Sequence, residues 1–374
     1  MSKYVMRLRQ SIAAASSLET WLTESSRLAV HLARQTKTRE SRQLLAEIRE
    51  KAKHTLIAST FARLHLAEAI NCANDADLEM ARRSCQRSYA LSRIDGTAYC
   101  EVGAWLAHFE QNAGNEEKTV DLLRSTFEYA IEGDLGGVSR ASLTLANELH
   151  SLDQFHVALE FYQVARRCAE ILGDDATVAE LLFNIAAFGI ENSRIKCIDA
   201  EAQQTETAFF LSHARSAQRY CNLLCMNGGA WMFTLLEMNI EALTGCYSIL
   251  SSKDIWGHLE IIQRSRPSLY WLHRADKLIA DIRLNHTEQA PAELEYLLAH
   301  ADRITSSEEL AMFYWQLSKG CKLVKLDDRS QFCDRQIKIH LEILRVSRAK
   351  RRTSASLLAA VDAGRICLRR LELT

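Results

Sequence analysis

The chain has 374 residues, of which only 14 are glycine and 2 are proline, while 48% are hydrophobic. So few turn residues do not suit a sheet protein with many hairpins, and the composition therefore predicts an almost entirely helical chain. The 46 basic and 47 acidic side chains give a net charge of −1, which argues against a general attraction to nucleic acid or to an anionic membrane.

The sequence carries no recognisable signal for membranes, secretion or catalysis. No stretch approaches the run of about 18 apolar residues that predicts a membrane span, and the charged N-terminal segment is not typical of a secretory signal. The eleven cysteines lack the spacing of a disulfide framework, which favours a reducing compartment, so we expect a cytoplasmic protein. Because common phosphate, dinucleotide, hydrolase and zinc motifs are absent, we expect no enzymatic activity, cofactor or metal site in this chain.

In chain order, residues 1–52 are expected to form two or three helices that cap the rest of the chain. Residues 53–352 are predicted to form one repeat solenoid, and residues 353–374 a separate C-terminal helix. At several breaks in the solenoid Gly ends one helix and Asp begins the next, which is typical of helix termini. These breaks predict the first helix pairs at 54–94, 97–132, 138–172 and 176–222.

A pair of residues, Leu or Ile followed by Ala, recurs through the first half of the chain with steps of 40, 39 and 40 residues. Self-similarity at a period of roughly 20 to 50 residues predicts a solenoid, in which each unit buries its apolar face by stacking on its neighbours. In the second half, Trp271-Leu272 repeats the earlier Trp105-Leu106, so the register resumes after a shift. The recurring pairs are Leu66-Ala67, Leu106-Ala107, Leu145-Ala146 and Ile185-Ala186.

One unit has a fuller pattern, which reads Leu145-Ala146-x2-Leu149 and then Ala158-x3-Tyr162-x2-Ala165. In this pattern the chain resembles the tetratricopeptide repeat, a family whose small residues let two paired helices approach closely. The resemblance implies a right-handed superhelical solenoid of about seven helix pairs, with a period of about 40 residues. It also implies a concave groove that receives a peptide, a protein or a small ligand.

The repeat phase predicts which side chains face that groove. If the Leu of each pair faces the stack, residues five before it and two or five after it lie on the opposite face of the helix, at 100° per residue. We expect this face to be solvent-accessible and to bind the ligand, although any amphipathic helix also has a polar outer face. The residues selected in this way are Asn71, His108, Gln111, Arg140, Asn147 and His150, with Arg274 and Lys277 in the later register.

The last helix, from about Ser354, has small or apolar residues at alternating four- and three-residue steps, namely Leu357, Val361, Gly364, Leu368 and Leu371. This spacing predicts a short heptad seam that pairs with a second copy of the chain. The ending Leu371-Glu372-Leu373-Thr374 is similar to the junction helix that precedes the catalytic domain of bacterial diguanylate cyclases with tetratricopeptide sensor regions. That resemblance implies a non-catalytic sensory region of a signalling protein.

Three other functions remain open, and one of them is an enzyme with an unfamiliar all-α active site. N-terminal helices followed by a repeat stack also resemble the bacterial quorum-sensing regulators that bind short peptides, and a protein–protein adaptor would have the same layout. The gene sequence after Thr374 separates these possibilities, because an in-frame cyclase domain indicates the sensor and a stop codon favours an independent regulator or adaptor.

Three polar motifs have structural interpretations. Asp174-Asp175 follows a helix-ending Gly, so we expect it to cap the next helix. The basic run Arg348, Lys350, Arg351 and Arg352 is expected to be a solvated helix end. Cys221 and Cys225 share one helical face without a second ligand pair, so we expect core cysteines and no zinc site.

Overall fold

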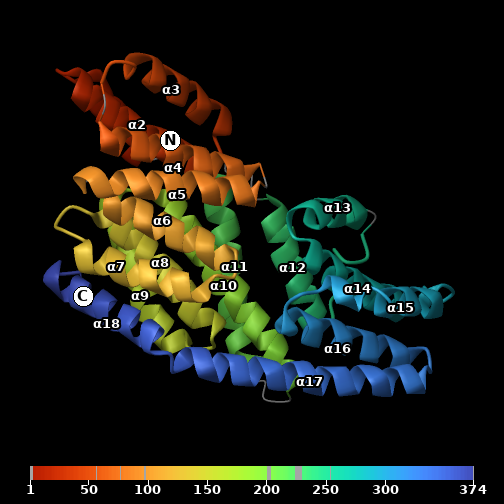
Figure 1. The fold of residues 1–374 in the computed structure, drawn as a ribbon. Helices are drawn as coiled ribbons and strands as arrows, with labels where there is room; N and C mark the ends of the chain where they lie inside the picture. The colour runs from red at the N-terminus through yellow and green to blue at the C-terminus, as the bar shows by residue number, and fades with distance from the viewer. Residues whose placement is uncertain are drawn as a thin grey trace. The chain divides into compact units, whose positions relative to one another are not determined.

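The structure is a computed structural model that describes residues 3–55, 57–75, 77–96, 98–199, 204–223, 230–252 and 254–373, without the side chains of residues 95, 204–207, 223, 230, 231 and 265. Within these ranges the regular elements are helices, and neither a strand nor a sheet occurs in them (Figure 1). The prediction of an all-α chain is confirmed for the described residues.

The chain folds as two compact units. Unit 1 comprises Met1–Asn184, Ala217–Gly228 and Arg352–Thr374, and unit 2 comprises Ile185–Ser216 and Gly229–Arg351. These boundaries differ from the predicted ones, because the N-terminal and C-terminal segments belong to the same unit as the first repeats.

Unit 1 is built from neighbouring helix pairs. Within it α4 packs on α5, α6 on α7 and α8 on α9, while α2 packs on α4 and α6 on α8. The helices are α1 (Lys3–Ala13), α2 (Leu18–Arg34), α3 (Thr38–Lys51), α4 (Ala58–Asn74), α5 (Leu78–Asp95), α6 (Tyr99–Asn112), α7 (Glu116–Tyr129), α8 (Leu135–Ser151), α9 (Phe155–Leu172), the first turns of α10 (Asp175–Ile198), the end of α11 (Gln204–Leu223) and α18 (Ala355–Arg370).

The recurring pairs lie where the sequence predicts them. Leu145 and Ala146 are fully buried, as are Ala158 and Ala165, because small residues at these positions let α8 and α9 approach closely. The breaks are confirmed as well, since Gly173 ends α9 in the left-handed region at φ 72°, where a residue without Cβ has no steric cost. The predicted helix pairs at 54–94, 97–132 and 138–172 agree with the observed ones to within a few residues, whereas the predicted pair at 176–222 corresponds to α10 and α11, which are each divided between the two units.

Unit 2 has its core around α14, which packs on α13, α15 and α16. Leu272 and Ile279 of α14 are buried against Phe313 and Leu317 of α16. The helices of this unit are the remainder of α10, the start of α11, α12 (Ala230–Thr244), α13 (Ile255–Ser265), α14 (Pro267–Arg283), α15 (Ala290–Leu298), the short 3-10 helix η2 (Ala301–Arg303), α16 (Ser307–Leu323) and α17 (Asp327–Arg352).

The predicted dimer seam lies inside unit 1. Leu357, Val361 and Leu368 of α18 are 3%, 6% and 4% exposed, and α18 packs on α7. A Cβ added at Gly364 would lie 2.7 Å from Cε1 of Phe161, so the glycine allows a close approach to α9. The expectation that these side chains are available to a second molecule is wrong for these three. The apolar face of α18 is already covered by an apolar face of its own chain, and only Leu371 stays partly exposed.

Leu368→Asp is expected to lower the free energy of unfolding by at least about 3 kcal/mol, because the carboxylate would be buried without a partner. The matched control is Ile366→Asp on the same helix, whose side chain is 63% exposed, and its effect should stay within about 0.5 kcal/mol. Urea unfolding of both variants measures the difference. If Leu368→Asp unfolds like the control and changes only self-association, α18 is a dimer helix after all.

Candidate functional site

The predicted groove residue Arg140 lies on α8, in a cluster of charges between the first helices of successive helix pairs in unit 1. Its guanidinium forms two hydrogen bonds with Glu180 of α10, at 2.5 and 2.6 Å, and lies 4.0 Å from the ring centre of Trp105 on α6. The Arg140 side chain is 3% exposed and that of Glu180 is 31% exposed. This bidentate pair joins equivalent positions of neighbouring repeats and fixes both side chains.

A second ion pair joins residues that are far apart in the sequence. Arg34 at the end of α2 lies 2.7 Å from Oδ2 of Asp174. The backbone N–H of Thr177 donates to Oδ1 of Asp174 at 3.3 Å, and the Thr177 hydroxyl donates to Oδ2 at 2.8 Å. The predicted capping role of Asp174 is confirmed by the Thr177 bonds. Burial alone would raise the pKa of Asp174, but the charge of Arg34 and the hydrogen bonds lower it to about 2.

His31 of α2 completes this contact. Its Nδ1 lies 3.8 Å from Oδ1 of Asp174, its Nε2 lies 3.1 Å from Nε2 of Gln35, and its ring packs edge-on against Tyr4. The residue is 1% exposed, and this burial lowers the pKa of His31 to about 4. The imidazole is therefore neutral at physiological pH.

The other predicted groove residues of unit 1 do not converge on one point. His108 packs edge-on against Trp105, whereas Gln111 donates hydrogen bonds to Oε2 of Glu148 (3.1 Å) and to a backbone carbonyl of α8 (3.3 Å). Asn147 and His150 both contact the hydroxyl of Tyr162 on α9, at 3.0 and 3.3 Å. The amide of Asn71 donates to the hydroxyl of Ser41 on α3 at 3.0 Å.

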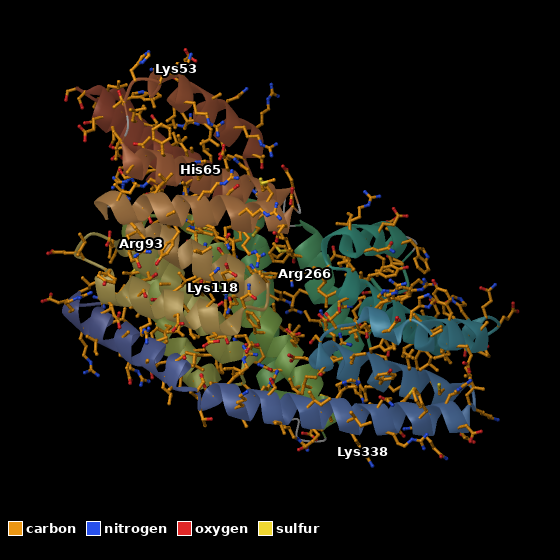
Figure 2. The ribbon with its side chains drawn as sticks, viewed as in Figure 1. Lys53, His65, Arg93, Lys118, Arg266 and Lys338 are labelled. Atoms are coloured by element: carbon orange, nitrogen blue, oxygen red, sulfur yellow. The ribbon has the colours of Figure 1, made fainter. Side chains whose placement is uncertain are left out.

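The expected solvent access is wrong for four of these residues. Asn71 and His150 are 1% exposed, and Arg140 and Asn147 are 3% exposed, while His108 and Gln111 are half-buried. The physical reason is that neighbouring helices supply polar partners, so this face is buried by hydrogen bonding instead of being left to water. The exposed charges lie elsewhere, as in Lys53, Arg93 and Lys338, of which Lys53 and Lys338 are at the rim of the view in Figure 2.

The two predicted residues of unit 2, Arg274 and Lys277, line a hollow of about 920 Å³. It lies over α14 and is bordered by α13, by the start of α15 and by the loops before α13 and after α14. Trp256 of α13, which is 47% exposed, supplies its aromatic face. Its charged lining residues are Arg274, Lys277, Asp281, Glu288 and Glu293. His286 adds an imidazole, and the neutral polar lining includes Ser251, Ser252, Asn285 and Gln289.

Each cation of the hollow is paired within it. Nε of Arg274 lies 2.7 Å from Glu293, and Nη1 donates to the hydroxyl of Tyr270 at 3.1 Å. Burial alone would lower the pKa of Arg274, but the hydrogen bond and charge of Glu293 raise it. Nζ of Lys277 lies 2.5 Å from Asp281 and 5.0 Å from the ring centre of Trp256, so this ring already holds a cation.

A buried polar network anchors the other side of α14. Asp276 accepts hydrogen bonds from Arg194 of α10 (2.8 and 3.2 Å) and from Gln316 of α16 (2.7 Å), and its Oδ2 lies 2.9 Å from Nδ1 of His273. Arg194 also donates to Asn239 of α12. The side chains of Arg194, Asp276 and His273 are fully buried. This network holds α14 in place and thereby positions Arg274 and Lys277 on its outer face.

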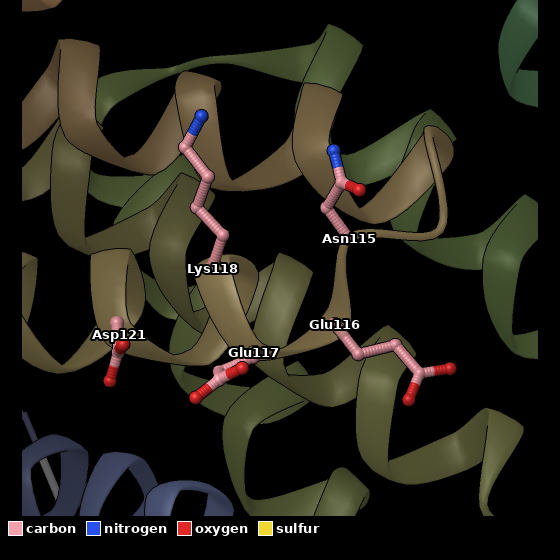
Figure 3. Close-up of a pocket in the computed structure, with 5 residues that line it drawn as sticks. All are labelled: Asn115, Glu116, Glu117, Lys118 and Asp121. Atoms are coloured by element: carbon pink, nitrogen blue, oxygen red, sulfur yellow. The ribbon is translucent and has the colours of Figure 1, made fainter.

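A second hollow, of about 560 Å³, lies at the start of α7 (Figure 3). Asn115 and Lys118 point to one side, where both contact the buried carboxylate of Glu110 at 2.5 Å, while Glu117 and Asp121 point to the other side. Acidic residues in a first helical turn are favoured by the helix dipole. We therefore assign this acidic surface a structural role.

The remaining polar motifs are partly corrected. Arg348 is 8% exposed and donates to Glu308 (2.6 Å) and to Asn192 (2.8 Å), so this member of the basic run is not solvated. Cys225 lies outside the described residues. In the described part of the chain, no three His, Cys, Asp or Glu side chains gather as metal ligands. No helix there is both long and apolar enough to cross a membrane.

Sequence reasoning missed Trp256, Asp281 and Glu293. Asp281 could have been found, because it stands four residues after Lys277 and such pairs meet on a helix. Nothing local in the sequence points to the other two, which come from different helices.

Comparisons with protein-family models, curated proteins and solved structures found no match to this chain.

The neutral His31 predicts a dependence of stability on pH. Between its unfolded pKa of 6.5 and its folded pKa of about 4, the unfolded state binds more protons than the folded state. The contribution of His31 is thus complete above pH 6.5 and falls by up to about 3 kcal/mol as the pH drops to 4. Urea unfolding of His31→Gln should lose this part of the slope, whereas the exposed control His156→Gln should keep it.

Arg194→Met is expected to lower the free energy of unfolding by about 3–5 kcal/mol, because it leaves Asp276 buried without its cation. Arg345→Met is the matched control, since the Arg345 side chain is 57% exposed and pairs with Asp199 at 2.5 Å; the loss there should not exceed about 1 kcal/mol. Thermal and urea unfolding test this difference. Equal losses in the two variants would contradict the anchoring role of the network.

Proposed function

We propose that the chain is a non-catalytic recognition module and that the hollow of unit 2 is its ligand-binding surface. The observation that carries this proposal is that Arg274 and Lys277, selected from the repeat register alone, line a hollow of about 920 Å³ together with a half-exposed tryptophan. Binding sites commonly have volumes of about 300–1,000 Å³ and combine aromatic surface with a few polar groups. The ligand is a peptide, a protein segment or a small molecule.

We further propose that the helix pairs form a right-handed solenoid of the tetratricopeptide type. The packing of neighbouring pairs in unit 1 and the burial of Ala146, Ala158 and Ala165 support this assignment. Repeat scaffolds of this kind bind partners and rarely carry chemistry themselves, although a fold does not fix a function.

Within signalling, the proposed role is the sensory region of a protein of the diguanylate cyclase type. The support is the likeness of the last residues to a junction helix. The seam of α18 adds no support, because its apolar side chains are already buried within unit 1. The alternative is a stand-alone peptide-binding regulator of the quorum-sensing type, or an adaptor, and a ligand-binding hollow in unit 2 suits both the sensor and the alternative. The gene sequence beyond codon 374 decides between them.

Trp256→Ala is expected to weaken ligand binding by a factor between about 5 and 150, because stacking on an aromatic face contributes about 1–3 kcal/mol. Native mass spectrometry of the purified chain, followed by thermal shift against a peptide and metabolite library, identifies the ligand. Trp21→Ala is the matched control, since Trp21 also lies under a cation, Lys51 at 3.9 Å, but in unit 1. If Trp21→Ala weakens binding and Trp256→Ala does not, the hollow is not the site.

A further inference from the structure

The charges of the hollow in unit 2 are unequal. Among its described lining residues, Asp281, Glu288 and Glu293 face two permanent cations, Arg274 and Lys277, and the imidazole of His286. Glu293 and Asp281 neutralise these cations at 2.7 and 2.5 Å, so Glu288 has no lysine or arginine counter-ion within the described lining. The residual charge is negative, and an anionic ligand would meet three carboxylates and two cations that are already paired.

The position of Lys277 shows what kind of group the hollow accepts. Its ammonium lies 5.0 Å from the ring centre of Trp256 and contacts Asp281, while its side chain is only 12% exposed. A ring face attracts a cation electrostatically, and the adjacent carboxylate neutralises it, which together form a site for a weakly hydrated organic cation. Trp256 keeps 47% of its surface exposed, so a ligand can reach the ring and compete with Lys277 for it.

We propose that the hollow binds an organic cation, an ammonium or guanidinium group on an apolar body, between Trp256 and Asp281, and that Lys277 is the internal occupant which the ligand displaces. The proposal rests on the proposed binding role of the hollow. Such a cation occurs in a small amine or in a lysine or arginine side chain of a peptide. The geometry requires no covalent step, because the ammonium of Lys277 and the ligand exchange one position.

Lys277→Met gives a test in which the sign of the effect is decisive. Removing the internal cation leaves the ring and Asp281 available, so affinity for an organic cation should rise about threefold to fivefold. If the hollow instead binds anions through Lys277, the same substitution must weaken binding. Asp281→Asn should weaken cation binding, because the carboxylate that neutralises the ligand is lost.

The probes are 2-phenylethylammonium, its neutral counterpart 2-phenylethanol and the anion 3-phenylpropionate, with N-acetyl-arginine amide as the peptide-like cation. Saturation-transfer NMR and calorimetry on the full chain measure their affinities at constant ionic strength. The matched control is Lys51→Met, because Lys51 lies 3.9 Å from the ring centre of Trp21 and pairs with Glu47 at 3.3 Å, outside any part of this hollow. That variant should leave all affinities unchanged.

The expected result is that both cations bind, the alcohol and the anion bind at least about tenfold more weakly, and Lys277→Met strengthens cation binding. A preference for 2-phenylethylammonium over N-acetyl-arginine amide identifies a small amine as the source, and the reverse identifies a peptide. If the alcohol or the anion binds as well as the cations and Trp256→Ala abolishes that binding, the hollow is a ligand site but the cation inference is wrong. If no cation binds to the parent chain or to Lys277→Met, the inference is also wrong, whereas the ligand library decides the proposed function separately.

Discussion

A buried arginine–aspartate pair that joins distant helices is the contact on which the rest of each unit depends. In unit 1 Arg34 reaches Asp174 across about 140 residues of sequence, and in unit 2 Arg194 reaches Asp276 across 82. A stack of helical hairpins otherwise contains mainly contacts between neighbours. Because an unpaired buried charge costs several kcal/mol, each pair forces its two helices to meet in one arrangement. The pairs therefore set geometry more than they add net stability.

The same need to pair buried polar groups explains why the polar face predicted to line a groove in unit 1 is not open to solvent. Arg140, Asn147 and His150 each have a partner on a neighbouring helix, so the polar groups that we assigned to ligand binding contribute to helix packing. In unit 2 the paired polar groups lie on one side of α14 only, and the other side remains available to line a hollow. The buried network holds the inner side of α14, and the outer side is left to carry Arg274 and Lys277 into a hollow.

The hollow also contains ion pairs of its own, and such pairs can make a site selective for the charge of a ligand. Its cations are paired with its own acids. Under the proposed function a ligand would compete with an internal group, and this competition would disfavour ligands of the wrong charge. The aromatic face of Trp256 is the one large apolar surface among the described lining residues that remains half-exposed. Recognition through such a face depends on shape and on the electrostatic attraction between the ring and a cation more than on a single hydrogen bond.

The sequence by itself determined the helical class, the first helix pairs and the buried Leu-Ala positions, because periodicity and Gly–Asp breaks are local properties of the chain. It also selected Arg274 and Lys277, since their spacing from Leu272 places them on the outer face of one helix. Only the tertiary structure decided that Asn147 and His150 are internal, that α18 covers α7 with its seam, and that Trp256 and Glu293 join the hollow. These outcomes depend on which surfaces meet after folding. A periodic pattern predicts on which face of a helix a side chain lies, but it does not predict which other helix packs on that face.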